Sequence, residues 1–191
     1  LISGANGFLP SYIVYTLLYL NRIKNLNIKI IGLVRNKQKA LEKFQGHQEN
    51  LDLIEHNICN EFYTDRKIDI IIHAASQASP KVFKDDPVGT ILPNVIGTNN
   101  LLKLAKEKNV EDFIFFSTTG VYGFFDKDVY PIKEDCFGSI NSTDLSSCYI
   151  ESKRMGENLC IAYMNQYNIP VKIIRPSITY GPGIKLDDGR S

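Results

Sequence analysis

Tyr149 and Lys153 are the two residues of this chain whose types and spacing best suit acid–base chemistry. On a helix, a separation of four residues puts both side chains on one face, about one turn apart, so that the ammonium lies near the phenol oxygen. A free phenol loses its proton near pH ~10. To act as a base at pH 7, its pKa must be lowered by roughly 3, which corresponds to about 4 kcal/mol. Because a nearby cation favours the phenolate, the pair can supply a base.

Three hydroxyl residues, Ser117 to Thr119, come before this pair in the chain. Thr118 can donate a hydrogen bond to, or accept one from, a substrate hydroxyl that the tyrosine deprotonates. An oxidised nicotinamide beside these side chains would add a second positive charge that favours the phenolate. The three side chains would then form one site for proton and hydride transfer. The Tyr-x-x-x-Lys spacing alone also occurs by chance on amphipathic helices.

A glycine-rich turn, Gly4-Ala-Asn-Gly7, lies between a strand end at Leu1 to Ser3 and a helical stretch that runs to about Asn21. This order lets backbone amides and the helix N-terminus face a pyrophosphate. Pro10 stands where the GxxGxxG pattern has its last glycine. Proline suits the first turn of a helix but removes the close approach of helix and strand that glycine allows. We expect phosphate binding with altered packing, against the alternative of a glycine turn without a ligand.

The second predicted strand, Ile28 to Val34, is followed by Arg35 and Asn36. An acidic side chain at this place would hold the ribose hydroxyls of NAD, whereas an arginine can pair with the 2′-phosphate of NADP. Arg35 therefore favours NADP over NAD. The alternative is that it is solvated, like the basic run that continues to Lys43 on one face of a short helix.

Strands and helices alternate along the rest of the chain. Apolar runs predict further strands at Leu51 to Ile54, Ile68 to His73, Phe113 to Phe116 and Val171 to Arg175, and helical patterns cover Asp85 to Asn109 and Tyr149 to Tyr167. This alternation predicts an α/β fold with a doubly wound, Rossmann-like parallel sheet covered on both faces. Ligands bind at the carboxyl edge of such sheets, where Ser117 and Thr118 would lie.

Three local features refine this prediction. Pro93 inside the first of those helices predicts a kink near Leu92. His73 ends a strand next to alanines, so we expect a structural histidine. The segment from Tyr130 to Ser147 is a long loop without periodicity, of a kind that is usually functional.

Composition excludes several function classes. The chain has 22 basic and 21 acidic residues among 191, a net charge of +1, which gives no indication of nucleic-acid binding. Its four cysteines form no CxxC pair and have no histidine partners at zinc spacing, so we expect no metal site and reduced thiols in a cytoplasm. The longest apolar stretch is far shorter than the ~20 residues that span a bilayer, so no membrane segment is predicted.

Both ends of the sequence look cut, because Leu1-Ile2 is only the end of a strand and the last residues have no closing element. We expect residues 1–183 to form an NAD(P)-binding Rossmann domain. Residues 184–191 would begin a small substrate-binding domain, most of which the sequence lacks.

Five motifs in order give the chain a resemblance to a known family. They are Gly4-Ala-Asn-Gly7, His73-Ala-Ala75, Ser117-Thr-Thr-Gly-Val-Tyr-Gly123, Tyr149-Ile-Glu-Ser-Lys153 and Arg175 to Pro182. Together they resemble the extended short-chain dehydrogenase/reductase family, and more narrowly its NAD(P)-dependent nucleotide-sugar epimerases and dehydratases. The stretches His73 to Pro80, Lys153 to Glu157 and Asp187 to Arg190 are similar to the UDP-glucuronate decarboxylase branch.

This resemblance implies roles for individual residues. Tyr149 would be the base, Lys153 would hold the nicotinamide ribose and lower the tyrosine pKa, and Thr118 would bond the sugar hydroxyl that is oxidised, usually at C4. The bound NAD or NADP would return the hydride later. Cofactor contacts would come from Gly4, Asn6, Gly7, Phe8 and Leu9 at the pyrophosphate, Asn57 and Ile58 at the adenine, Ala74, Ala75 and Ser76 at the ribose, and Pro176, Ser177 and Thr179 at the nicotinamide side. We also expect Arg35, Ser117, Tyr149 and Lys153 among the cofactor-binding residues.

The chain also departs from the family pattern. Decarboxylases and 4,6-dehydratases carry an acidic side chain where this chain has Gly120, and dehydratases carry an aspartate where it has Thr119. Without that carboxylate, decarboxylation and water elimination lose their acid or base, whereas epimerisation needs none. Ile178 also stands where the family usually has an asparagine near the substrate.

Three hypotheses follow. The first is a nucleotide-sugar epimerase, or a relative that oxidises C4, which acts as a homodimer through the helices Asp85 to Asn109 and Tyr149 to Tyr167. The second is an NADPH-dependent carbonyl reductase, which Arg35 and Ile178 favour mildly. The third is a non-catalytic nucleotide-binding protein of the same fold, against which the intact Thr118, Tyr149 and Lys153 argue.

Overall fold

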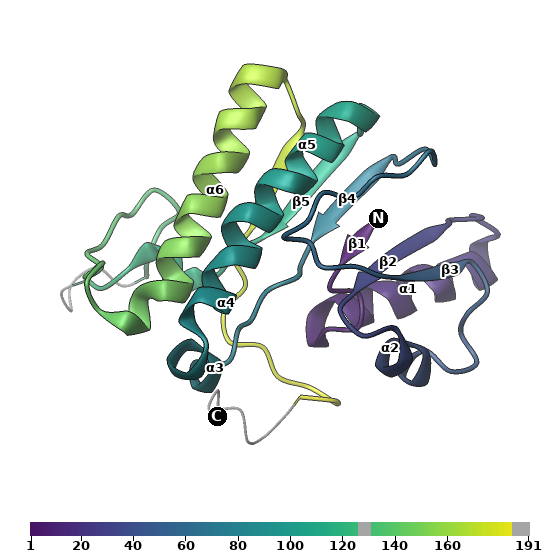
Figure 1. The fold of residues 1–191 in the computed structure, drawn as a ribbon, viewed down its shortest axis with the longest axis horizontal. Coiled ribbons are helices and arrows are strands. Elements are labelled where there is room, and N and C mark those ends of the chain that lie inside the picture. The colour runs from purple at the N-terminus through teal and green to yellow at the C-terminus, as the bar shows by residue number, and fades with distance from the viewer. Residues whose placement is uncertain (126–130, 185–191) are drawn as a thin grey trace.

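Six parallel strands form one sheet in the order β3-β2-β1-β4-β5-β6 in the computed structural model, which describes residues 1–125 and 131–184 (Figure 1). The strands are β1 (Ile2–Ser3), β2 (Ile30–Val34), β3 (Leu51–Glu55), β4 (Ile70–His73), β5 (Asp112–Phe116) and β6 (Val171–Ile174). The chain builds outward from β1 to β3 and then returns to β4 on the other side of β1. This order confirms the doubly wound sheet and places a ligand crevice beyond the carboxyl ends of β1 and β4.

The helices lie in two groups on opposite faces of the sheet. They are α1 (Phe8–Lys24), α2 (Lys37–Lys43), α3 (Pro80–Asp85), α4 (Pro87–Leu92), α5 (Thr98–Lys108) and α6 (Cys148–Tyr167), with shorter turns η1 (Pro93–Gly97), η2 (Thr119–Tyr122) and η4 (Leu145–Ser147). Helices α4, α5 and α6 lie together, away from α1 and α2 (Figure 1).

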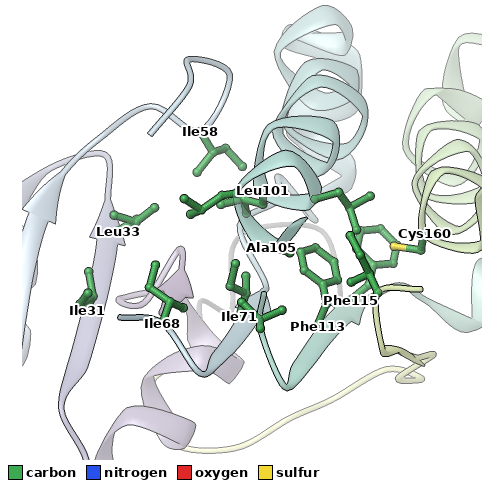
Figure 2. Packing of buried hydrophobic residues seen from close by; sticks show 14 residues of the cluster. Ile31, Leu33, Ile58, Ile68, Ile71, Leu101, Ala105, Phe113, Phe115 and Cys160 are labelled. Atoms are coloured by element: carbon green, nitrogen blue, oxygen red, sulfur yellow. The ribbon is translucent and has the colours of Figure 1, made fainter. Parts of the chain in front are cut away.

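Two apolar clusters hold these layers together. On one face, Ile71, Phe113 and Phe115 of β4 and β5 pack against Leu101 of α5 and Cys160 of α6, as Figure 2 shows. On the other face, side chains of α1 and α2 pack against β1, β2 and β3. Both clusters use the alternate residues of the strands, since successive side chains of a strand point to opposite faces.

The predicted helix from Asp85 to Asn109 is three consecutive segments. Helix α4 ends at Leu92, a π-helical turn covers Pro93–Gly97, and α5 begins at Thr98. Proline has no N–H to donate inside a helix and displaces the carbonyl one turn earlier, which favours such a widened turn. The break predicted near Leu92 is therefore confirmed as an irregular, π-helical turn.

Three helices end at asparagines in the left-handed conformation, which favours glycine or asparagine. These are Asn25 after α1, Asn109 after α5 and Asn168 after α6, with φ of 51°, 49° and 56°. Helix α1 thus ends at Lys24, beyond the predicted end near Asn21.

One side of β4 and β6 is only partly covered by the described residues. Ile70 and Ile174 point away from the cluster under α5 and α6, and each is 42% exposed. On the same side, Lys172 of β6 pairs with Asp112 of β5.

A chain of hydrogen bonds crosses the core at the end of β4. Ser3 Oγ accepts the backbone N–H groups of residues 74–75 at 3.1 Å each, so its own proton points to His73 Nδ1, 2.8 Å away. His73 Nε2–H then donates to Thr98 Oγ1 at 3.0 Å, and Thr98 donates to the carbonyl of Asn94 at 2.5 Å. Both ring nitrogens of His73 are thus engaged inside the core, as a structural role requires.

The buried His73 should make folding stability depend on pH. Burial, with the nearby charge of Lys153, lowers the pKa of His73 to about 3 from the ordinary 6.5. Its contribution is complete above pH 6.5 and is lost as the pH falls toward 3, because the unfolded chain binds a proton that the folded chain refuses. We expect the free energy of unfolding in urea to fall by up to about 1.4 kcal/mol per pH unit from this group. The His73→Gln variant should show a shallower slope, and equal slopes would contradict this account.

Candidate active site

A cavity of about 870 Å³ opens beyond the carboxyl ends of β1, β4, β5 and β6. Five stretches of chain form its wall: the glycine turn and start of α1, the segment after β4 with α3, the residues after β5, the start of α6, and the residues after β6. Its lining residues are Gly7 to Pro10, Ala74, Ser76 to Phe83, Phe116 to Thr119, Tyr149, Lys153 and Pro176 to Thr179. Thr118, Tyr149 and Lys153 therefore lie around one cavity.

Lys153 is buried on the wall of this cavity, with only 2% of its surface exposed. Its Nζ donates to the carbonyl of Phe116 at 2.6 Å and lies 4.8 Å from the centre of the Phe115 ring. Burial lowers the pKa of Lys153 to about 7, while Cys160 and Glu157 act in the opposite direction. The end of β5 thus fixes this amine at the cavity.

Tyr149 is the second residue of α6 and is half-buried. Its ring stacks on the ring of Phe83, with centroids 4.8 Å apart and planes at 12°. Its backbone carbonyl accepts a hydrogen bond from Ser152 Oγ at 2.8 Å, inside the first turn of the helix. The helix sets the spacing to Lys153, and α3 supplies the neighbour of the ring.

Ser117 and Thr118 follow β5 directly. The hydroxyl oxygen of Thr118 accepts a hydrogen bond from the backbone N–H of Gly120 at 3.2 Å. Thr118 thereby caps the start of the turn η2. Ser117 is 3% exposed, and its Oγ has no hydrogen-bond partner among the described residues. A buried hydroxyl normally has a partner, so a polar group of a bound ligand fits at this place.

The glycine turn comes very close to the segment after β4. Gly4 has a φ of +66°, and a Cβ atom there would lie 2.8 Å from Cα of Ala75. At Gly7, a Cβ would lie 3.0 Å from both the Gly4 carbonyl oxygen and Cγ of Pro10. Pro10, buried in the first turn of α1, thus packs beneath the turn rather than opening it. The residues fit a backbone cradle for a phosphate.

Other predicted cofactor residues lie away from this cavity wall. Arg35 is exposed after β2, and its Nη1 and Nη2 lie 2.9 and 3.2 Å from the Gln77 amide oxygen, in the amide orientation that accepts from them. Asn6, in the glycine turn, has its backbone carbonyl 3.1 Å from Lys43 Nζ.

Asn57 and Ile58, predicted at the adenine, lie in the turn after β3. Asn57 Oδ1 accepts the backbone N–H of Cys59 at 3.1 Å. The Ile58 side chain is buried in the core beside Leu101, as Figure 2 shows. A contact from Ile58 to a ligand would therefore have to use its backbone.

Sequence reasoning missed the contribution of α3 and the residues just before it. Gln77 to Phe83 line the cavity, yet no residue of α3 is buried, so the helix has no apolar periodicity to find. The available signal was Ser79-Pro80, a residue pair typical of a helix start.

The cavity suits anionic ligands. Lys81 and Lys153 are among its lining residues, and none of the described residues that line it is an aspartate or glutamate.

Within residues 1–125 and 131–184, no group of three or more histidine, cysteine, aspartate or glutamate residues could hold a metal ion. Over the same ranges, every helix is too short or too polar to cross a membrane.

Residues 1–190 match the family described as the NAD-dependent epimerase/dehydratase family. The chain belongs to this family. UDP-glucuronic acid decarboxylase 6 of Arabidopsis thaliana is 37% identical over 190 residues, which are 100% of this chain and 53% of that relative. UDP-glucuronic acid decarboxylase 1 of Xenopus tropicalis is 34% identical over 100% of this chain and 43% of its own length. The chain spans about half the length of these relatives.

A solved structure has a similar fold. The UDP-glucuronic acid 4-epimerase from Bacillus cereus, in complex with NAD, is 27% identical and has a TM-score of 0.76, over 97% of this chain and 58% of that one.

Two arginines lie beside the turn η2, which contains Gly120 and Tyr122, with Arg175 Cζ 4.7 Å from the centre of the Tyr122 ring. Arg154 of α6 donates to the carbonyls of Val121 at 2.8 Å and Gly138 at 3.0 Å. Arg175 after β6 pairs with Glu157 through two hydrogen bonds of 2.9 and 2.7 Å. At position 120, a Cβ atom would lie 3.3 Å from Cγ1 of Ile150. The place of the missing carboxylate is therefore beside an aliphatic side chain.

Proposed function

We propose that the protein is a nucleotide-sugar epimerase that oxidises a sugar hydroxyl, at C4, and then reduces the ketone from the other face. The observation that carries this proposal is that Thr118, Tyr149 and Lys153 line one cavity with the glycine turn. Tyr149 takes the hydroxyl proton, Thr118 bonds the same hydroxyl, and Lys153 holds the cofactor ribose beside the tyrosine. Bound NAD or NADP supplies the chemistry of accepting and returning a hydride.

The residues fit such a dinucleotide in three ways. The turn is free of side chains at Gly4 and Gly7, where a Cβ atom would lie 2.8 Å from Cα of Ala75 and 3.0 Å from the Gly4 carbonyl oxygen, as a phosphate cradle of backbone amides requires. The unpartnered hydroxyl of Ser117 suits a ribose or amide group. Lys81 and Lys153 supply positive charge near an anionic ligand. On this proposal, residues 1–183 form the cofactor-binding domain and residues 184–191 begin the substrate domain. Residues 185–191 lie outside the described residues.

Epimerisation is favoured over decarboxylation by the chemistry of the wall. The relatives from Arabidopsis and Xenopus are named UDP-glucuronic acid decarboxylases. In this chain, however, Gly120 and the neighbouring Ile150 offer no acid or base, and the described residues that line the cavity include no carboxylate. With bound NAD or NADP to accept and return the hydride, exchange at one carbon needs from the protein only the tyrosine, lysine and threonine.

The test uses the complete protein with a panel of nucleotide sugars, followed by NMR. We expect conversion of a nucleotide sugar into its C4 epimer with no net change in reduced nicotinamide and no release of carbon dioxide. Consumption of NADPH with simple carbonyl compounds would instead support a carbonyl reductase, the candidate that Arg35 favours. Binding of nucleotide sugars without any turnover would support a binding protein.

Arg35 allows a prediction about cofactor choice. We propose that it pairs with the 2′-phosphate of NADP, since no acidic residue follows β2 and Gln77 holds the guanidinium at the end of that strand. A charge-assisted hydrogen bond is worth about 1.5–3 kcal/mol, so Arg35→Ser should weaken NADPH binding by roughly 10- to 100-fold and change NADH binding little. Fluorescence titration measures the dissociation constants of NADPH and NADH. Arg22→Ser, at an exposed arginine on α1, is the control, and equal losses for both cofactors would disprove the role.

Assembly and compartment are further parts of this proposal. Helices α4 and α6 carry exposed apolar side chains, among them Val88, Met155 and Ile161, and we propose that two copies pair through the helical segment Asp85 to Asn109 and the helix α6. Sedimentation of the complete protein at several concentrations measures this. A cytoplasmic location is proposed from the four cysteines, all free in the structure.

A further inference from the structure

The ring of Phe83 covers one face of the Tyr149 ring. The centroids are 4.8 Å apart and the planes are within 12° of parallel, so the two rings form a stacked pair. Phe83 also lines the cavity, as does Tyr149. Aromatic pairs at this distance attract beyond their burial alone, and the phenol therefore has a preferred orientation.

Helix α3 packs beside α4 and the turn η4 at the surface of the molecule. None of its residues, Pro80–Asp85, is buried. Beyond the ring stack, the thiol of Cys148, next to Tyr149, lies 3.9 Å from the carbonyl of Phe83 and donates to it. Both ties join α3 to the first residues of α6, at the catalytic end of that helix.

Different elements therefore hold the two halves of the acid–base pair. The amine of Lys153 is fixed by the Phe116 carbonyl at the end of β5. The phenol of Tyr149 starts from the first turn of α6, where the backbone fixes only its Cβ, and the direction of the ring depends on its rotamer. The Phe83 ring restricts this rotamer from the α3 side.

We propose that Phe83 is a positioning residue that holds the Tyr149 ring in the orientation needed for proton transfer. It does not touch the reacting atoms; it acts through the phenol. Because a displacement of the reacting group of about 1 Å can cost on the order of 100-fold in rate, loss of the stack should lower turnover more than it changes binding. This inference rests on the proposed function of Tyr149 as the base.

The kinetic test compares three variants of the complete protein. Phe83→Leu keeps an apolar side chain but loses the ring, and we expect kcat to fall about tenfold, with KM and cofactor affinity changed less than about twofold. Phe83→Tyr keeps the ring and should restore most of kcat. Phe62→Leu removes a half-buried phenylalanine in the connection after β3 and should leave kcat unchanged. A failure of Phe83→Tyr to rescue, or an equal loss in Phe62→Leu, would overturn the proposal.

A second measurement does not depend on activity. In protein labelled with ¹³C-tyrosine, the Tyr149 ring signals are assigned by their loss in Tyr149→Phe. We expect Phe83→Leu to move these signals, because the ring current is lost, and to speed ring rotation, while Phe83→Tyr preserves both. Unchanged Tyr149 signals in Phe83→Leu would overturn the positioning role even in an active enzyme. If the labelled ring responds as expected but no nucleotide sugar is turned over, the proposed function fails and the stack remains.

Discussion

Replacing Tyr149 with phenylalanine should lower turnover by roughly 10²- to 10⁴-fold, the range typical of losing a general acid–base group. Phenylalanine keeps the ring that stacks on Phe83 and removes only the hydroxyl. Folding and cofactor content should therefore stay as in the parent protein. NMR of the nucleotide-sugar mixture measures turnover, and absorbance of the released cofactor measures content.

A matched control for this variant lies on the same helix. Tyr167→Phe changes a tyrosine at the far end of α6, which packs against Tyr163 and away from the cavity. It should keep full activity. Turnover of Tyr149→Phe within a few-fold of the parent would remove the tyrosine from the proposed mechanism.

Replacing Lys153 with methionine should lower activity by at least about 100-fold and at the same time stabilise the fold. In the proposed mechanism the ammonium holds the cofactor ribose and favours the phenolate, and methionine would provide neither interaction. Yet burial lowers the pKa of Lys153 from the ordinary 10.5 to about 7. At about 1.4 kcal/mol per pKa unit, the charged amine costs the folded state several kcal/mol at pH 7. A loss of the hydrogen bond to Phe116 offsets part of that gain.

The pH dependence of this effect has a definite sign. The folded pKa lies below the unfolded one, so between about pH 7 and 10.5 the unfolded chain binds the extra proton, and stability of the parent protein rises with pH. Lys153→Met should lack this rise, whereas Lys24→Met, at an exposed lysine of α1, should retain it. Urea unfolding at pH 7, 8 and 9 separates them. A destabilised Lys153→Met with a parental slope would mean that the amine is not held in a dry environment.

Most of the sheet could be predicted because its strands are apolar runs that end at glycine, asparagine or small residues. Pro93 likewise predicted the interrupted helix, because a proline inside a helix removes one backbone hydrogen bond in any fold. Strand and helix ends differed by one to three residues in places, as at Ile30, where pairing with β3 sets the start. The helix-end asparagines explain why α1 continues to Lys24.

The site was less predictable, for a different reason. The four-residue spacing of Tyr149 and Lys153 is local, so helical geometry alone places them together. Phe83 reaches Tyr149 only through the tertiary contact of α3, which has no periodic apolar face. In the same way, the pairing of Arg35 with Gln77 joins the ends of two different strands, and no local pattern reports it.

The uncovered side of β4 and β6 bears on how firmly the catalytic rim is held. Parallel strands usually have both faces dry, but Ile70 and Ile174 remain wet among the described residues. Ser117 begins the rim, and its backbone N–H donates a hydrogen bond to the carbonyl of Ile174. A polypeptide segment that covered these isoleucines would also slow the opening of that hydrogen bond. The rate of amide hydrogen exchange at Ser117 therefore measures how strongly the far face of the sheet stabilises the site.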